Sequence, residues 1–250
     1  PALPPHPGGA VTAGFSRDGR WIFSAGEDGE ARLIEARSLA LQARVPHSGA
    51  LTAMAASADG SRLASAGRDG VLLVWDRSGR ILTRCGHAGG PAWTDVDISR
   101  DGKRLVAIRE SEDGMTPDLL LTPAGSTCQL TRLSGHFGNV ASASFDESGD
   151  RVLSFGNNDH TARVWDAGLG TLLATLTHPD EVLSASFSPD GKEIAVAVAD
   201  GSVYRWTPWG RLLGRPLELP PPLRADLPPA LATAARHAPD GRLLAVASSD

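Results

Sequence analysis

Apolar and polar residues alternate with a period of two along most of the chain, in short runs that end at glycine-containing turns. The stretch 47–76 shows this pattern most clearly. Its alternating runs are separated by two turns, at 57–60 and 67–70, and each turn ends in a glycine that can adopt a positive φ. The alternation predicts β-strands with one buried face, joined as antiparallel hairpins.

The same turn and the residues around it recur along the chain. Six turns end in a glycine, and these glycines are 41 to 50 residues apart. Four of them have a His thirteen residues earlier and a Trp or Ile fifteen or sixteen residues later. The six glycines are Gly19, Gly60, Gly102, Gly149, Gly191 and Gly241. An internal period of this length predicts a repeat architecture.

These residues resemble the WD40 family of β-propellers, whose repeat of about 40–45 residues forms one four-stranded blade. The resemblance covers essentially the whole chain and implies an all-β fold of four-stranded antiparallel blades. About five and a half blades are present. We expect them to come from a ring of seven blades, with an atypical ring of six as the alternative. A single propeller domain is expected over 1–250, with repeats near 6–46, 47–86, 87–135, 136–177, 178–227 and, incomplete, 228–250.

The ends of the sequence supply no strands that would complete the last blade. The sixth repeat reaches Asp250, the position of a family Asp, before its third strand begins. We therefore expect the chain to be part of a longer protein. Because an incomplete ring exposes strand edges, we also expect this segment to self-associate. Arg- and Ala-rich arrays of this kind resemble the sensor or scaffold portions of bacterial multidomain signalling proteins.

In the family, a hydrogen-bonded tetrad of His, Ser or Thr, Asp and Trp ties each blade together. Carried over by position, two repeats have all four residues. The first repeat has Ile34 in place of Trp, the fifth has Val196 in place of the hydroxyl, and the third keeps little beyond His87. The complete tetrads are His47, Ser65, Asp69 and Trp75, and His136, Ser154, Asp159 and Trp165.

The resemblance also implies where partners bind. The family's binding face is formed by the His-bearing loops and by the turns between second and third strands, and the side chain before the tetrad Asp points into it. Trp93 follows an enlarged loop and is expected there as an aromatic anchor, with a place in the core as its alternative. The candidates are Glu27, Arg68, Trp93, Asn139 and Asn158, with Ala199 and Ser249 at equivalent positions. Trp209 is expected on the opposite face.

Composition narrows the class of partner and compartment. The net charge of −5 argues against a nucleic-acid-binding protein. No apolar run is long enough to cross a membrane, and no signal-type leader is present. The two cysteines, Cys85 and Cys128, fall on outer strands of different blades. We therefore expect free thiols, a reducing compartment and a cytoplasmic location.

Catalytic and metal-binding readings are weaker than structural ones. Ser, His and Asp within one repeat suggest a hydrolase triad. However, the trio recurs at a fixed phase with a Trp, and the chain has no Gly-x-Ser-x-Gly elbow. The histidines belong to separate blades and lack the spacing of metal ligands. No phosphate-binding loop is indicated, and we expect no catalytic residue, metal or cofactor.

The sequence thus favours a non-catalytic scaffold or sensor that binds a protein or peptide on the His-loop side of the blades. Glu27 and Glu112 near Arg68 make the expected face mixed in charge, which suits a peptide better than a polyanion. One alternative is a hydrolase-like propeller with its site in the central channel, although the inner strands 140–145 and 182–187 offer Ala and Ser there. Another is a purely structural spacer.

Overall fold

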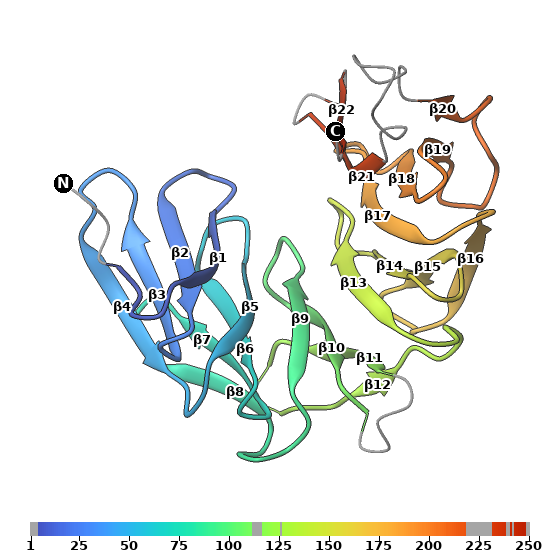
Figure 1. Ribbon diagram of the computed structural model, residues 1–250. Coiled ribbons are helices and arrows are strands. Elements are labelled where there is room, and N and C mark those ends of the chain that lie inside the picture. The colour runs from blue at the N-terminus through green and yellow to red at the C-terminus, as the bar shows by residue number, and fades with distance from the viewer. Residues whose placement is uncertain are drawn as a thin grey trace. The chain divides into compact units, whose positions relative to one another are not determined.

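A computed structural model describes residues 5–111, 117–125, 127–218, 232–238, 241 and 243–248. These residues form strands and turns without a helix, as the all-β prediction requires, and so include no helix that could cross a membrane. The chain divides into two compact units, Pro1–Arg132 and Leu133–Asp250 (Figure 1). Glu112, Ser249, Asp250 and the prolines between 220 and 229 lie outside the described residues.

The first unit contains three four-stranded sheets, called blades 1 to 3. In each, strands adjacent in sequence pair antiparallel, so every blade is a meander. Blade 1 comprises β1 (Ala10–Phe15), β2 (Trp21–Gly26), β3 (Glu30–Glu35) and β4 (Leu41–Pro46); blade 2 comprises β5 (Leu51–Ala56), β6 (Arg62–Gly67), β7 (Val71–Asp76) and β8 (Ile81–Gly86); blade 3 comprises β9 (Trp93–Ile98), β10 (Arg104–Arg109), β11 (Asp118–Pro123) and β12 (Thr131–Arg132).

The second unit contains two further four-stranded blades and a two-stranded hairpin, called blade 6. Blade 4 comprises β13 (Val140–Phe145), β14 (Arg151–Gly156), β15 (Thr161–Asp166) and β16 (Leu172–Thr177); blade 5 comprises β17 (Val182–Phe187), β18 (Ile194–Val198), β19 (Ser202–Trp206) and β20 (Leu217–Glu218); blade 6 comprises β21 (Ala232–His237) and β22 (Leu244–Ser248). The inner strands 140–145 and 182–187 have their predicted bounds.

Two outer strands are shorter than the period predicts. The spacing predicts a strand over 212–219 in blade 5, but β20 is reduced to Leu217–Glu218, and Leu212 forms only an isolated bridge to Trp206. Gly214, in a positive-φ conformation, and Pro216 interrupt the segment between them. In blade 3, β12 keeps Thr131–Arg132 of the predicted 129–133.

The expectation of two free thiols was wrong. Cys85 on β8 and Cys128 form a disulfide, with their Cα atoms 5.5 Å apart. The period did place the cysteines in neighbouring blades. Because Cys128 precedes the short β12 and is not paired in its ladder, it can pack against the core that contains Cys85. The sequence argument for a reducing compartment therefore no longer holds.

A close contact between blades recurs at the turn glycines. The first residue of a blade's second strand lies against the turn glycine of the next blade. A Cβ built on Gly60 would lie 2.6 Å from Trp21 Cδ1, and one built on Gly191 would lie 2.7 Å from Arg151 Nη2. Arg151 also donates to the Gly191 carbonyl at 2.8 Å. These positions need glycine twice, for a positive φ and for the absent side chain.

The equivalent turn glycine of blade 1 has no such contact. A Cβ on Gly19 would meet nothing within 4 Å, and the neighbouring Phe15 is 65% exposed. At the position equivalent to Phe15, Phe187 in blade 5 is covered by the Arg151 guanidinium, 5.4 Å from its ring centroid. Within the described residues of the first unit, no blade covers the surface at Gly19 and Phe15, whereas the equivalent surfaces of blades 2 and 5 pack against the preceding blade.

The two glycines make a matched test of this packing. Gly19 and Gly60 have φ values of 69° and 68° in equivalent turns, so alanine brings a similar backbone strain of about 1 kcal/mol to each. Gly60→Ala must in addition displace Trp21, and we expect it to cost about 1–3 kcal/mol more in unfolding free energy. Denaturant melts of both variants measure the difference. Equal losses would show that the contact between Trp21 and Gly60 contributes nothing.

Candidate functional site

The tetrad positions of blades 2 and 4 are joined by hydrogen bonds. In blade 4, His136 Nδ1 lies 2.7 Å from Asp159 Oδ2 and its Nε2 lies 2.8 Å from Ser154 Oγ. The Trp165 indole donates to the same Oγ at 2.8 Å. These residues come from the loop before β13, from β14, from the β14–β15 turn and from β15, so one network connects most of the blade.

Blade 2 has the same arrangement, but the contact between its His and its Asp is longer. His47 Nε2 lies 2.9 Å from Ser65 Oγ, and the Trp75 indole donates to that oxygen at 3.2 Å. His47 Nδ1 is 3.3 Å from Asp69 Oδ2. Asp69 Oδ2 also accepts from the amide of Ser48 at 3.0 Å, so the carboxylate holds the loop after His47 as well.

The direction of these bonds follows from the carboxylate, which can only accept. The His136 proton therefore sits on Nδ1 and is donated to Asp159. In the neutral ring Nε2 then accepts the proton of the Ser154 hydroxyl, and Ser154 Oγ in turn accepts from the Trp165 indole. Burial lowers the pKa of His136, against the opposing pull of Asp159. Burial acts to raise the pKa of Asp159, but the hydrogen bond and charge of His136 together with further donors hold it below its usual value.

A non-glycine residue follows the tetrad Asp of blade 4. This residue, His160, occupies the position of Gly29 and Gly70 in blades 1 and 2, and its φ is 53°. The His160 carbonyl accepts from the His178 amide at 3.0 Å, as the Gly29 carbonyl accepts from the His47 amide at 2.7 Å. The link from one blade's turn to the next blade's loop is thus kept although a side chain replaces glycine.

Blade 1 keeps three tetrad positions and has Ile34 at the fourth. His6 Nδ1 lies 2.8 Å from Asp28 Oδ1, and His6 Nε2 lies 2.8 Å from Ser24 Oγ. Since Ile34 carries no N–H, Ser24 lacks the indole donor that Ser154 has. Part of the lost connection to the third strand is supplied by an arginine.

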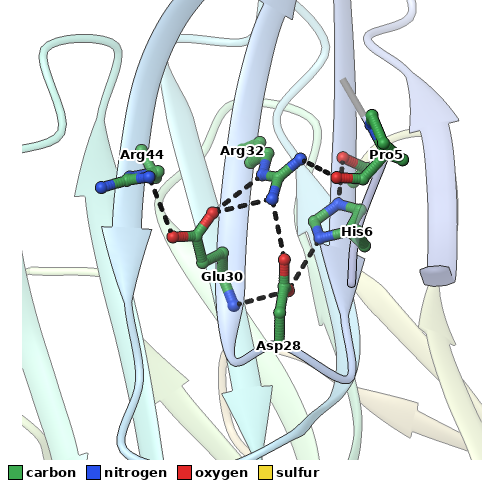
Figure 2. A network of polar contacts seen from close by, with 7 residues as sticks. Pro5, His6, Asp28, Glu30, Arg32 and Arg44 are labelled. Carbon is green, nitrogen blue, oxygen red and sulfur yellow. Dashed lines mark hydrogen bonds and ion pairs between the residues drawn. The ribbon is translucent and has the colours of Figure 1, made fainter. Parts of the chain in front are cut away.

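Arg32 on β3 connects the tetrad carboxylate to the outer strand (Figure 2). It donates to Asp28 Oδ2 at 2.7 Å and, with two nitrogens, to Glu30 Oε2. Glu30 Oε1 also pairs with Arg44, which lies directly opposite Arg32 on β4. A cavity of about 330 Å³ beside this network is lined by Pro5, Pro7, Asp28, Glu30, Arg32, Leu41 and Arg44. Both carboxylates are already paired, so the network is best explained as a structural replacement for the indole.

Blade 5 is connected differently because Val196 supplies no hydroxyl. The Trp206 indole donates directly to His178 Nε2 at 3.0 Å. Asp200 accepts from the Tyr204 hydroxyl at 2.9 Å, and the buried His178 Nδ1 has no hydrogen-bond partner within the described residues. Asp200 is therefore exposed, whereas Asp69 and Asp159 are held closer to the blade.

Blade 3 has no tetrad, as its sequence indicates. His87 is exposed, and its nearest polar partner is the carbonyl of Ala88 at 3.3 Å. An ion pair lies on the strands instead: Arg109 on β10 donates to Asp118 on β11 at 2.9 Å. Arg132 on β12 pairs with the same carboxylate at 3.1 Å, so Asp118 connects three strands.

Trp93 does not lie on the surface. Its exposed fraction is 0%, its indole donates to the Gly70 carbonyl at 3.0 Å, and the Arg109 guanidinium lies 5.6 Å from its ring centroid. Gly86 of blade 2 leaves room for the ring, because a Cβ on Gly86 would lie 3.1 Å from the indole nitrogen. Trp93 thus fills the core, the alternative left open by the sequence, and cannot act as a surface anchor.

The other candidates are exposed, in two separate groups. Glu27 and Arg68 occupy equivalent turns of the first unit, where their amides donate to the carbonyls of Gly9 and Ala50. Asn139 and Asn158 lie in the second unit, and Ala199 there is half-buried. We call the surface formed by the His-bearing loops and the turns between second and third strands the His-loop face of each unit.

One residue of this face was missed. Phe137 follows the tetrad His136 and is 78% exposed. Its amide donates to Asp159 Oδ2 at 3.2 Å, so the loop that carries it is held by the tetrad. An apolar residue directly after the tetrad His was the available signal, because the equivalent residues are Pro7, Ser48, Ala88 and Pro179.

The geometry offers little to a hydrolase reading. The hydroxyls of Ser65 and Ser154 are fully buried, and each accepts an indole N–H while bonded to a histidine. A nucleophile must reach its substrate. Within the described ranges, no three His, Cys, Asp or Glu side chains gather in a way that could hold a metal ion.

Comparison with known proteins identifies the family. A family model described as "WD domain, G-beta repeat" matches residues 2–35, 41–76, 126–166 and 170–207, more than half of the chain. The chain belongs to the WD40-repeat family. Its four-stranded antiparallel sheets are the blades of a partial β-propeller. The unmatched stretch 77–125 includes most of blade 3, the WD40 blade that lacks a tetrad.

Relatives share segments of the chain. Periodic tryptophan protein 2 homolog of Schizosaccharomyces pombe is 44% identical over 78 residues, which are 31% of this chain and 9% of that protein. Coronin-7 of Homo sapiens is 29% identical over 167 residues, 64% of this chain and 16% of that protein. An uncharacterised WD repeat-containing protein of Synechocystis is 28% identical over 109 residues, 40% and 28% respectively. The chain therefore spans less than a third of each relative's length.

The buried His178 of blade 5 makes the unfolding free energy depend on pH. Burial lowers the pKa of His178 to about 4, so the folded chain favours the neutral ring. The unfolded chain takes up a proton near pH 6.5, so this contribution to stability is complete above that pH and is lost as the pH falls towards 4. We expect a loss on the order of 3 kcal/mol in unfolding free energy between pH 7 and pH 4.

Two glutamine variants test this dependence. His178→Gln keeps an acceptor for the indole but does not titrate, and in urea melts at both pH values it should lose much less stability than wild type. His87→Gln, at an exposed position, should keep the full loss. If His178→Gln loses as much stability as wild type, the assignment to His178 is wrong.

Proposed function

We propose that this WD40 chain is a non-catalytic interaction module that binds a segment of a partner protein on its His-loop face. The proposal rests on one observation: the loops that bear the exposed side chains of this face are held in place by hydrogen bonds to the tetrads. Asp69 bonds the loop of Ser48, and Asp159 bonds the amide of Phe137. Surface groups held in place in this way lose little conformational entropy when a partner binds.

The charge of the face supports a protein partner. In the first unit, Glu27 and Arg68 present opposite charges from equivalent turns. In the second, Asn139 and Asn158 present amides that can both donate and accept. Mixed charge and amides suit a polypeptide better than a polyanion, which would need a basic surface. The buried tetrad hydroxyls disfavour the alternative of a hydrolase.

The names of the relatives are consistent with this proposal without identifying the partner. Coronin-7 and periodic tryptophan protein 2 homolog are WD-repeat proteins of which the chain covers a small part. A spacer that only positions neighbouring domains remains the competing function, and it requires no binding to the His-loop face.

Surface variants test the proposal against a partner recovered by affinity capture. Arg68→Glu and Asn158→Ala should each weaken its binding by about 1–3 kcal/mol, because exposed groups on the binding face are removed while the fold is kept. Trp209→Ala is the matched control. Trp209 is 70% exposed in the turn after β19, at the other end of the blade 5 strands from the His-loop face.

Titration of the purified partner by calorimetry gives the affinities. If Trp209→Ala abolishes binding while Arg68→Glu and Asn158→Ala bind like wild type, the wrong face has been chosen. If no partner is captured, and Arg68→Glu and Asn158→Ala change no measured interaction, the spacer function is supported instead.

A further inference from the structure

Phe137 is the one large apolar side chain among the residues that follow the repeat histidines. It is 78% exposed, yet its backbone is fixed, because Asp159 accepts its amide N–H at 3.2 Å. The next residue, Gly138, has a φ of 106°, and a Cβ built on it would lie 3.1 Å from Asn158 Cβ. The loop and the β14–β15 turn therefore pack together beneath an exposed aromatic ring.

Two neutral amides lie on the segments next to this residue. Asn158 is on the turn that packs against Gly138, Asn139 immediately precedes β13, and both are exposed. Each side chain can donate and accept, as the backbone of an extended peptide does. Exposed aromatic rings on rigid supports are frequent binding anchors. The blade 4 part of the face therefore suits a peptide with an apolar side chain.

The blade 5 part of the same face is acidic. The bond from the His178 amide to the His160 carbonyl, at 3.0 Å, joins the blade 5 loop to the turn that carries Asn158. Asp180 and Glu181 follow in that loop, and the Glu181 carbonyl accepts from the Ala199 amide, next to Asp200. The described residues hold no ion pair to any of these three carboxylates.

Asp200 is exposed because its tetrad is changed. In blade 4, Asp159 is bonded to His136 and nearly buried. With Val196 in place of the hydroxyl, His178 turns to Trp206, and its buried Nδ1 has no partner in the described part of blade 5. Asp200 keeps a bond from Tyr204 and stays exposed on the face.

We infer that blades 4 and 5 form one binding site for an extended segment of a partner protein that is apolar at one end and basic at the other. The apolar side chain packs on Phe137, Asn139 and Asn158 bond the peptide backbone, and Lys or Arg side chains pair with Asp180, Glu181 and Asp200. The inference rests on the proposed function and adds the chemistry of the partner.

The test is selection of a random library of twelve-residue phage-displayed peptides on the immobilised chain. Enriched peptides should carry an apolar or aromatic residue and at least two Lys or Arg. Their binding, measured by fluorescence anisotropy of the synthetic peptides, should weaken at least about tenfold in Phe137→Ala, since an exposed anchor is removed. It should weaken similarly in the triple variant Asp180→Asn, Glu181→Gln, Asp200→Asn, which should also lose most of its salt dependence.

Two controls separate this inference from the proposed function. Leu169→Ala removes a side chain of similar exposure, 76%, from the turn after β15 and should bind the peptides like wild type. Trp209→Ala, at the other end of the blade 5 strands, should also bind them like wild type. If the enriched peptides are acidic or uncharged, or if Phe137→Ala binds them normally while Arg68→Glu does not, this inference is overturned and the proposed function stands. If no peptide is enriched, both fail.

Discussion

The structure depends on a buried histidine that accepts at one ring nitrogen and donates at the other. In blades 2 and 4 the ring connects a hydroxyl on the second strand with a carboxylate in the following turn. The carboxylate can only accept and the indole N–H can only donate, so these two groups fix the direction of the bonds at the two ends of the network. An unpaired polar group at such depth would cost about 1–3 kcal/mol, so the residues specify one another.

Replacements within this network have local and readable consequences. With Ile34 in blade 1, Arg32 bonds the carboxylate and extends the network to β4. With Val196 in blade 5, the indole bonds the histidine directly and Asp200 is released to the surface. Blade 3 has no tetrad. Asp118 connects its strands through two arginines, and a disulfide joins blade 3 to blade 2. The blades therefore differ in surface chemistry at the positions where their sequences depart from the repeat.

The sequence predicts the parts of the fold that the period controls. Turn glycines and alternation locate the inner strands, because a positive φ and one buried face leave little freedom in register. The tetrad partners follow from the same spacing. The outer strands of blades 3 and 5 were overestimated. In blade 5, Gly214 and Pro216 end the pairing through their local backbone conformation.

Two of the three wrong or missed predictions share a cause. Trp93 begins an inner strand after an enlarged loop, and its burial depends on the Gly70 carbonyl and on Gly86 of another blade, which one repeat considered alone does not show. Phe137 was missed because the resemblance points to the residue before the tetrad Asp and not to the residue after the His. The disulfide was missed because the period assigns Cys85 and Cys128 to different blades and does not show that they lie close together. Trp93 and the disulfide both concern contact between repeats rather than structure within one.

The position of the histidine proton is the most direct test of this network. Two-bond ¹H–¹⁵N correlation spectra of the histidine rings distinguish the two neutral tautomers. The network predicts that His47 and His136 carry their proton on Nδ1, with Nε2 as acceptor. A proton on Nε2 of His136 would leave an unprotonated nitrogen facing the Asp159 carboxylate, with no donor between the two acceptors, and it would contradict the network described for blade 4.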